Sequence, residues 1–357
     1  MSARTVAGVA LLALLGAAVV LLARGAHDGA AGGSATLPGA GPTVALGGPS
    51  TCLPCHAQVV DEWKASMHAV AFTDPQVRGP EPAGSVNFSK QECLPCHAPA
   101  PVFTAGIVRD TRVLARVERR ADGVDCLSCH GLPDGVAASR AGLTGACRPV
   151  QRAELSTELV CQACHNQHQT HDEWRASPAA AAGKDCLDCH MAKVERTGAE
   201  ASAPRTGASH RFLGGRDREF ALSGLTLAGR VEGRELVATL HNDFAGHNLP
   251  TDSRNRALDL VVTVFDARGR EIGPPAGEAR EPGCEAGTAR LRFRNPYRAS
   301  GLPSTQLPAG QRAEVRVTLP PGATRATVEL FYKLEPWIED RGAHWTQRLE
   351  MALPAAP

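Results

Sequence analysis

Five short segments of the chain repeat one pattern of two cysteines and a histidine. Each reads Cys-x-x-Cys-His, and all lie between residues 52 and 190 of a chain of 357 residues. The cysteines are Cys52, Cys55, Cys93, Cys96, Cys126, Cys129, Cys161, Cys164, Cys186 and Cys189, and the histidines are His56, His97, His130, His165 and His190. In this pattern the two thiols add to the vinyl groups of one haem and the histidine binds its iron. We therefore expect five covalently attached haem c groups.

Two other interpretations of paired cysteines fit this pattern less well. Zinc prefers four ligands in a closed tetrahedron, and its sites usually combine two Cys-x-x-Cys pairs. Five motifs are an odd number of pairs, and a histidine follows each pair at once. A disulfide inside each motif would leave these histidines unexplained.

The second axial ligand of each iron must come from elsewhere in the chain. After the five motif histidines and His27 are set aside, seven of the thirteen histidines remain, and beyond the initiator only three methionines are present. Because few methionines are available, we expect mostly bis-histidine ligation. The expected distal ligands are His68, His168, His171, His210 and His247, with His241 as the next candidate and His344 after it. Met191 is assigned to packing.

The sequence separation between a distal histidine and the nearest motif indicates that this histidine does not bind the haem of that motif and serves a different haem. Apolar residues at helical spacing predict a helix over residues 57–72. In such a helix His68 would lie about 18 Å beyond His56 along the axis. His168 follows His165 by three residues and would share its helical face. Ligation across motifs would bring neighbouring haems close together, as electron transfer requires.

The elements that position these residues differ between the two halves of the chain. Residues 52–217 contain too few bulky apolar residues to fill a core of their own. We expect haems to supply that core, within short helices and loops of little regular structure. One unit is duplicated there, since residues 61–66 read Asp-Glu-Trp-Lys-Ala-Ser and residues 172–177 read Asp-Glu-Trp-Arg-Ala-Ser.

Residues 218–357 have a different pattern, without Cys-x-x-Cys-His motifs and with alternating apolar and polar residues. Seven short strands are predicted, at residues 225–231, 235–241, 258–266, 289–294, 313–319, 327–334 and 346–353. They indicate an antiparallel β-sandwich, so the predicted fold class is α+β. His247 lies in a Gly-flanked loop between two strands. Because the haem region offers only four distal histidines for five positions, we expect the sandwich to supply His247 as the fifth.

The N-terminus predicts export from the cytoplasm. Residues 6–23 form an apolar run between Arg4 and Arg24, so residues 1–26 are a signal peptide or an N-terminal membrane anchor. Residues 27–51, rich in Gly, Ala and Pro, are predicted to be a flexible linker. We expect a periplasmic protein anchored to the inner membrane, with the cell surface as another possible location. In such a compartment Cys147 and Cys284 form either one disulfide or two separate thiols.

Several segments resemble multihaem cytochromes of the cytochrome c-554 and hydroxylamine oxidoreductase-like superfamily. The similar segments are residues 52–68, which read C-L-P-C-H-x6-W-x2-S-x-H, residues 123–131 and 186–191, and the His-Arg-Phe-Leu-Gly-Gly run of residues 210–215. The resemblance implies that His68 and His210 are axial ligands. The chain departs from the family's catalytic members because it has no Cys-x-x-Cys-Lys motif and no evident crosslinking tyrosine.

These observations predict an electron-transfer protein rather than a catalyst. The expected partners are redox proteins, an unidentified donor and acceptor, and the membrane through the N-terminal segment. A formal net charge of +1 gives no basis for nucleic-acid binding. The alternative is a haem oxidoreductase of small nitrogen or sulfur oxyanions, which requires one haem with an open iron position.

The five complete motifs predict five covalent haems per mature chain. The pyridine haemochrome assay, referred to protein mass, measures this number. Four or fewer haems in fully matured protein would contradict the equal treatment of the motifs. Replacing both Cys126 and Cys129 by Ala should remove one haem and destabilise the haem region.

Overall fold

The computed structural model describes residues 45–74, 93–108, 111–196, 205–251, 256–274, 289–295 and 303–354, which belong to one compact unit, Thr43–Pro357. Within these ranges no helix has the length and apolar character needed to cross a membrane. The predicted signal or anchor, most of the linker and Cys284 lie outside the described residues. Those predictions, and the disulfide of Cys147, remain predictions.

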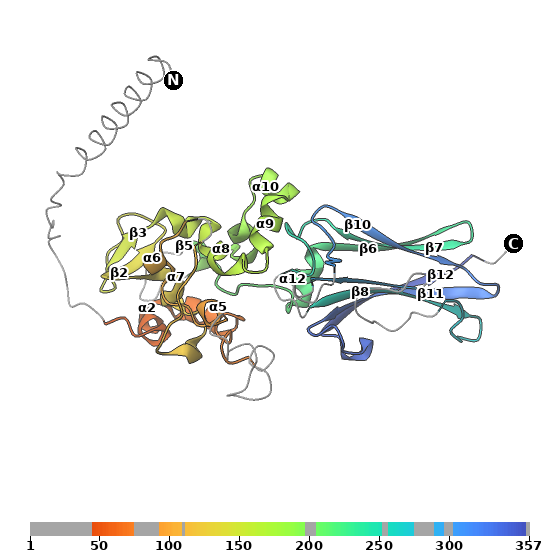
Figure 1. Cartoon of the computed structure of the whole chain (residues 1–357), viewed down its shortest axis with the longest axis horizontal. Helices are drawn as coiled ribbons and strands as arrows, with labels where there is room; N and C mark the ends of the chain where they lie inside the picture. The colour runs from red at the N-terminus through yellow and green to blue at the C-terminus, as the bar shows by residue number, and fades with distance from the viewer. Residues whose placement is uncertain are drawn as a thin grey trace, which may run out of the picture. The chain divides into compact units, whose positions relative to one another are not determined.

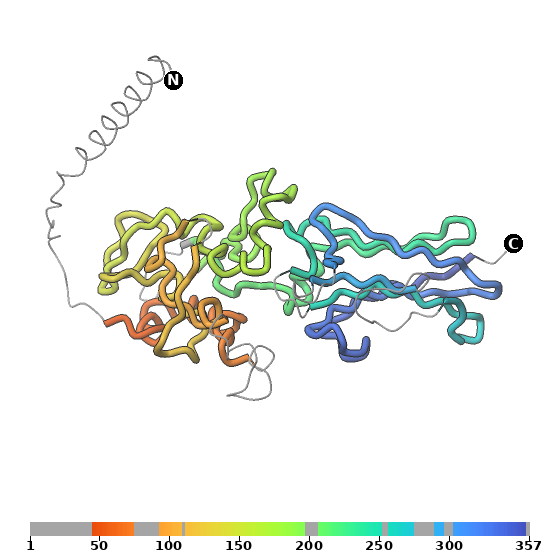
Figure 2. The backbone as a smooth tube through the Cα atoms, in the orientation of Figure 1, coloured from red at the N-terminus to blue at the C-terminus, as the bar shows by residue number. Residues whose placement is uncertain are grey.

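The haem region consists of short helices and short strands joined by loops (Figures 1 and 2). Its α-helices are α2 (Pro49–Lys64), α5 (Leu94–His97), α6 (Val102–Ala105), α7 (Cys126–His130), α8 (Leu159–His165), α9 (Thr170–Arg175), α10 (Pro178–Ala181) and α11 (Cys186–His190). Two 3-10 helices are η1 (Arg120–Asp122) and η2 (Ala153–Ser156). The strands are β1 (Gly131–Leu132), β2 (Gly135–Ala138), β3 (Pro149–Gln151), β4 (Lys193–Arg196) and β5 (Arg205–Ala208). Each Cys-x-x-Cys-His motif lies on a helical turn.

The end predicted for the first helix was wrong. Helix α2 spans Pro49–Lys64 and so ends before residue 72, and a kink at its motif histidine, His56, divides it just before the predicted start at residue 57. Proline at the first helical position favours the early start. At the other end Ser66 Oγ donates to the carbonyl of Trp63 over 2.7 Å, and so competes for an acceptor that a longer helix would use. His68 therefore lies in the turns after the helix, and the 18 Å separation does not apply.

The prediction that His168 shares a helical face with His165 was also wrong. Helix α8 ends at His165, and Gln169 adopts a left-handed backbone conformation with φ of 75°. A residue in this conformation cannot continue an α-helix. His168 therefore lies in the turn between α8 and α9.

The C-terminal region is an antiparallel β-sandwich, which confirms the predicted α+β fold class. Its elements are α12 (Arg218–Ser223), β6 (Leu225–Glu232), β7 (Glu235–Asn242), β8 (Ala257–Asp266), β9 (Arg290–Arg294), β10 (Arg312–Thr318), β11 (Ala323–Lys333), η4 (Asp340–Gly342) and β12 (Trp345–Ala352). One sheet has the order β10-β7-β6 and the other β12-β11-β8-β9. Each of the seven predicted strands overlaps one of these strands.

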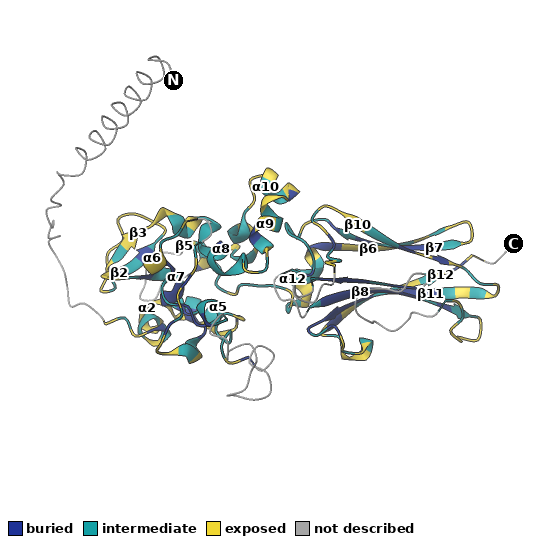
Figure 3. Cartoon of the chain, in the orientation of Figure 1, coloured by how far each residue is buried: buried dark blue, intermediate teal, exposed yellow. Residues whose placement is uncertain are grey.

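The apolar core lies almost wholly in the sandwich. Alternate residues of β8, including Leu258, Leu260 and Val262, point into one cluster with residues of the opposite sheet such as Leu240. In the described part of the haem region the buried apolar residues are Val60, Leu94, Ala98, Val102, Val113, Leu127 and Ala137. Figure 3 shows the difference, since the strands of the sandwich carry most of the buried positions. The protein chain alone gives the haem region little core.

The outer face of the four-stranded sheet carries a buried ionic cluster that the sequence pattern did not predict. Asp259 of β8 accepts hydrogen bonds from Arg292 Nε at 2.7 Å and from Arg290 Nη1 at 2.8 Å. The ammonium of Lys333 lies 3.1 Å from the same carboxylate, and Arg292 and Lys333 are each only 1% exposed. Asp340 accepts from both Arg290 and Lys333. Each carboxylate thus compensates cations taken out of water.

Replacing Asp259 by Asn should destabilise the sandwich strongly. Removing one partner from a buried ion pair typically costs about 3–5 kcal/mol, because the remaining charge is poorly compensated. Denaturant unfolding followed by circular dichroism would measure the effect. The matched control is Glu314→Gln, which alters an exposed pair with Arg230 and should change the midpoint little. Equal effects of the two substitutions would contradict the assignment.

Candidate haem sites

An aspartate sets the turn on which the third motif lies. Asp125 precedes Cys126 and N-caps helix α7, its Oδ1 accepting from the backbone N–H of Ser128 at 2.9 Å. The hydroxyl of Ser128 in return accepts from the N–H of Asp125 at 3.1 Å. This capping box fixes the orientation of the two cysteines and of His130. Asp185 caps helix α11 in the same way before the fifth motif.

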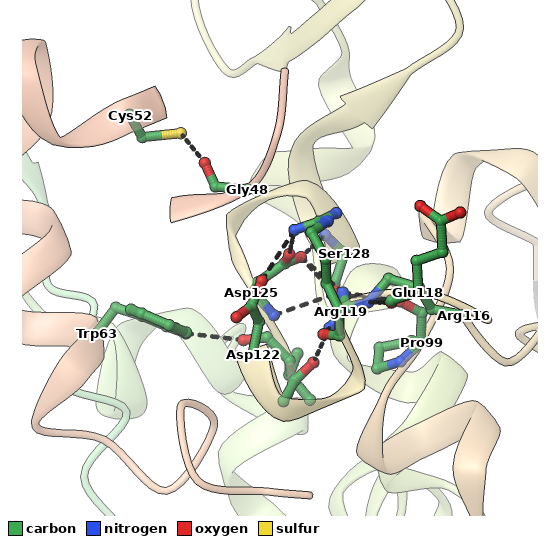
Figure 4. Close-up of polar contacts among 12 residues, drawn as sticks. Gly48, Cys52, Trp63, Pro99, Arg116, Glu118, Arg119, Asp122, Asp125 and Ser128 are labelled. Carbon is green, nitrogen blue, oxygen red and sulfur yellow. Dashed lines mark hydrogen bonds and ion pairs between the residues drawn. The ribbon is translucent and has the colours of Figure 1, made fainter. Parts of the chain in front are cut away.

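Two arginines hold the Asp125 cap in place (Figure 4). Arg116 is 9% exposed, and its Nη1 lies 3.0 Å from Asp125 Oδ1. Its Nη2 donates to the carbonyl of Gly123 at 2.8 Å. Arg119 Nη1 reaches the other oxygen of Asp125 at 2.8 Å. These residues were not predicted to be parts of the site, although the sequence shows an aspartate directly before two of the motifs.

The approach to the third motif packs directly against the segment of His68. Gly123 has a φ of 60°, and a Cβ at this position would lie 2.4 Å from the carbonyl oxygen of His68. The next residue, Val124, donates its N–H to that carbonyl at 2.9 Å. Glycine is therefore required here for both conformation and space.

Three of the predicted distal histidines each face a motif histidine from a distant segment. The ring centres of His68 and His165 are 6.1 Å apart, those of His130 and His210 are 6.3 Å apart, and those of His190 and His247 are 6.2 Å apart. The ring planes of the last two pairs are 27° and 10° from parallel. Two imidazoles bound to opposite sides of one metal ion, each by a bond of about 2 Å, have ring centres roughly 6 Å apart. The spacing fits an iron atom between each pair.

Backbone carbonyls orient several of these rings. The Nδ1 atoms of three motif histidines, His97, His130 and His190, lie 2.6–2.8 Å from the carbonyl oxygens of Ala71, Ala137 and Leu213. The Nδ1 atoms of His210 and His247 each lie 3.0 Å from a backbone carbonyl. A carbonyl can only accept, so Nδ1 carries the proton and Nε2 keeps the lone pair that a metal needs.

The two weakest candidates make different contacts. His344 Nε2 donates to the carbonyl of Arg216 at 3.0 Å. His241 Nε2 lies 3.3 Å from the carbonyl of Gly310, and its Nδ1 pairs with Asp243. In both residues Nε2 is engaged with a protein acceptor, so neither ring is presented as a metal ligand.

The remaining predicted distal ligands lie close together in the chain. His171 is on helix α9, is 5% exposed and has its ring centre 5.3 Å from that of Trp174. His168 lies in the preceding turn. That His168 and His171 are distal ligands stays a prediction.

Burial favours the neutral form of the paired histidines. It lowers the pKa of His130 and of His190 below the ordinary value. The pKa of His210 falls to about 4, chiefly through burial and then through the neighbouring His130. A neutral imidazole is the form that binds a metal ion.

The first cysteines of different motifs contact each other in two places. The thiols of Cys52 and Cys126 share a hydrogen bond, which lowers the pKa of Cys52 to about 7 and raises that of Cys126. The thiols of Cys161 and Cys186 share another. The first motif thus adjoins the third, and the fourth adjoins the fifth.

Comparisons with known proteins find a family and a solved structure to which the chain is similar. Residues 51–131 match the family described as cytochrome c554 and c-prime. A search among curated protein sequences finds no match to the chain. The crystal structure of a penta-haem cytochrome c552 from Thermochromatium tepidum is similar over 85% of this chain and 98% of that chain, with a TM-score of 0.58 and 18% identity. At this identity the similarity shows a shared fold.

The family match covers the first three attachment motifs, and the structural similarity extends over most of the chain. The predicted resemblance to the cytochrome c-554 type is therefore confirmed. Residues 51–131 thus match a cytochrome c family, and the chain, with its C-terminal β-sandwich, shares the fold of a penta-haem cytochrome; both findings support electron transfer by c-type haems.

Proposed function

We propose that the chain carries five haem c groups, one on each Cys-x-x-Cys-His motif, and passes electrons between them through irons with two histidine ligands. The observation that carries this proposal is the set of three facing histidine pairs, at 6.1–6.3 Å between ring centres. Haem c supplies a reversible one-electron couple at each site. The penta-haem cytochrome c552 with a similar fold supports the count.

The chain's own residues fix the rings and limit access to the iron. With haem bound, each facing pair would supply one histidine to either side of the iron and would leave no open position for a substrate. A carbonyl acceptor on Nδ1 holds four of these six rings in the orientation and tautomer that ligation needs. Six-coordinate sites of this kind favour electron transfer over catalysis.

The pair of His190 and His247 ties the sandwich to the fifth motif. Helix α11 ends at His190, and His247 lies in the loop that follows β7. The ring centre of Phe220 of α12 lies 5.1 Å from that of His190. We propose that the sandwich completes this haem site and so serves as part of the electron-transfer domain.

The location and partners proposed are those that the sequence favours. The protein would act in the periplasm, anchored to the inner membrane, or at the cell surface, and exchange electrons with a donor and an acceptor protein. The apolar run of residues 6–23 and the count of twelve cysteines, which an oxidising compartment tolerates, support this location. Cell fractionation followed by haem staining tests it.

Spin state decides between a carrier and an oxidoreductase. If every iron has two protein ligands, electron paramagnetic resonance of the oxidised protein should show low-spin haem alone, and the reduced protein should not bind carbon monoxide. A stoichiometric high-spin haem that binds carbon monoxide would instead identify an open site. Turnover of small nitrogen or sulfur oxyanions would then be tested at that haem.

The His247→Ala variant should gain one carbon monoxide-binding haem per chain while keeping all its covalent haem. Optical titration of the reduced protein measures this gain. His241→Ala is the matched control, because His241 lies on the adjoining strand with Nε2 engaged by Gly310, and it should gain none. Unchanged binding in the His247 variant would remove His247 from the ligand set.

A further inference from the structure

The tryptophans of the duplicated Asp-Glu-Trp unit make the same contact in both copies. Trp63 Nε1 donates to the carbonyl of Val124 at 2.8 Å, a contact drawn in Figure 4. Trp174 Nε1 donates to the carbonyl of Lys184 at 2.9 Å. Each acceptor lies two residues before the first cysteine of a motif, the third motif in one copy and the fifth in the other. Both motifs also begin with the aspartate cap described above.

The glutamate of the first copy binds the segment that carries His210. Glu62 Oε2 accepts from the backbone N–H of His210 at 2.7 Å. Its two oxygens also form a bidentate pair with Arg196, at 2.8 and 2.7 Å, and Arg196 is 7% exposed. Although burial alone would raise the pKa of Glu62, the hydrogen bonds from Arg196 and His210 lower it below its ordinary value.

The glutamate of the second copy binds the segment that carries His247. Glu173 Oε2 accepts from the hydroxyl of Thr251 at 2.6 Å, and Oε1 accepts from Gln306 Nε2 at 2.9 Å. Gln306 Nε2 also donates to the carbonyl of Pro250 at 2.9 Å. Both ends of this short loop are held, because Asn242 Nδ2 donates to the carbonyl of His247 at 2.9 Å.

The two copies thus act on equivalent places. In each, the tryptophan contacts the approach to a motif, while the neighbouring glutamate contacts the segment that carries the histidine facing that motif. The first copy does so for the pair of His130 and His210, and the second for the pair of His190 and His247. The contacts between thiols agree with this arrangement. The first unit follows the first motif and contacts the third, and Cys52 and Cys126 join these two motifs. The second unit follows the fourth motif and contacts the fifth, and Cys161 and Cys186 join those two.

We infer that Glu62 and Glu173 are positioning residues that hold His210 and His247 at their irons, so that each Asp-Glu-Trp unit clamps both sides of one haem site. This inference rests on the proposed bis-histidine ligation and adds the residues that maintain it. Loss of Glu62 releases the segment of His210, and loss of Glu173 releases the loop of His247. The contact of Glu62 is direct, whereas that of Glu173 lies four residues from the ring, so the first substitution has the larger effect.

Counting carbon monoxide-binding haems in the reduced holoprotein tests the inference. Glu62→Ala and Glu173→Ala should each gain up to one such haem per chain, with an accompanying high-spin signal in the oxidised form. The matched controls are Asp61→Ala and Asp172→Ala, which remove the preceding carboxylate of the same unit. Asp61 pairs with exposed Lys64 and Asp172 with Asn166, and neither control should gain binding.

Double variants identify which haem opens. Glu62→Ala combined with His210→Ala should bind no more carbon monoxide than His210→Ala alone, whereas Glu62→Ala with His247→Ala should show the sum. Glu173→Ala should add no carbon monoxide binding to His247→Ala, and should show the sum when it is combined with His210→Ala. If a glutamate variant loses covalent haem, Glu62→Gln and Glu173→Gln replace it, since an amide keeps one acceptor oxygen and should give a smaller gain.

The outcomes separate the two proposals. If His210→Ala opens a haem but Glu62→Ala does not, the positioning role is wrong and the ligation stands. The same holds for His247 and Glu173. An additive gain in Glu62→Ala with His210→Ala would also overturn the positioning role. If neither histidine variant opens a haem, the bis-histidine proposal itself fails, and the positioning role with it.

Discussion

The arrangement of the haem region depends on pairs of imidazoles whose ring centres lie 6.1–6.3 Å apart. This distance equals two metal–nitrogen bonds plus the distance from each ring centre to its nitrogen. Each such pair joins segments far apart in the sequence, as His130 and His210 do. For the pairs of His130 and His190, a helical turn capped by aspartate carries one ring, and a glutamate binds the segment of the other. With so few buried apolar residues in this region, polar contacts and the cofactor must do the work that a hydrophobic core does in the sandwich.

Much of the fold and of the site was predictable because their signals are local. The attachment motifs are contiguous, and alternation with period two identified the seven strands that the described residues of the sandwich form. His247 was selected by elimination and by its loop, and it lies opposite His190. The helix boundaries near His68 and His168 were wrong because side-chain contacts and backbone strain, rather than apolar spacing, end α2 and α8.

What sequence could not predict are the long-range polar partners. Arg116 has no local pattern that assigns it to Asp125, and the bonds from Arg196 to Glu62 span 134 residues. Asp259, Arg292 and Lys333 occupy strand positions that alternation assigns to solvent, yet they are buried and pair with one another there. The duplicated Asp-Glu-Trp unit was visible in the sequence, but only the structure shows which segments its side chains contact.

The contact between first cysteines of different motifs has a consequence for biogenesis. Two thiols within hydrogen-bonding reach, such as Cys161 and Cys186, are also near enough to be oxidised to a disulfide, which would block the attachment of two porphyrins at once. If the chain matures outside the cytoplasm, as proposed, its thiols must be kept reduced, or the attachment machinery must bind each motif while the segments are still apart. Folding that runs ahead of cofactor insertion would trap the apoprotein.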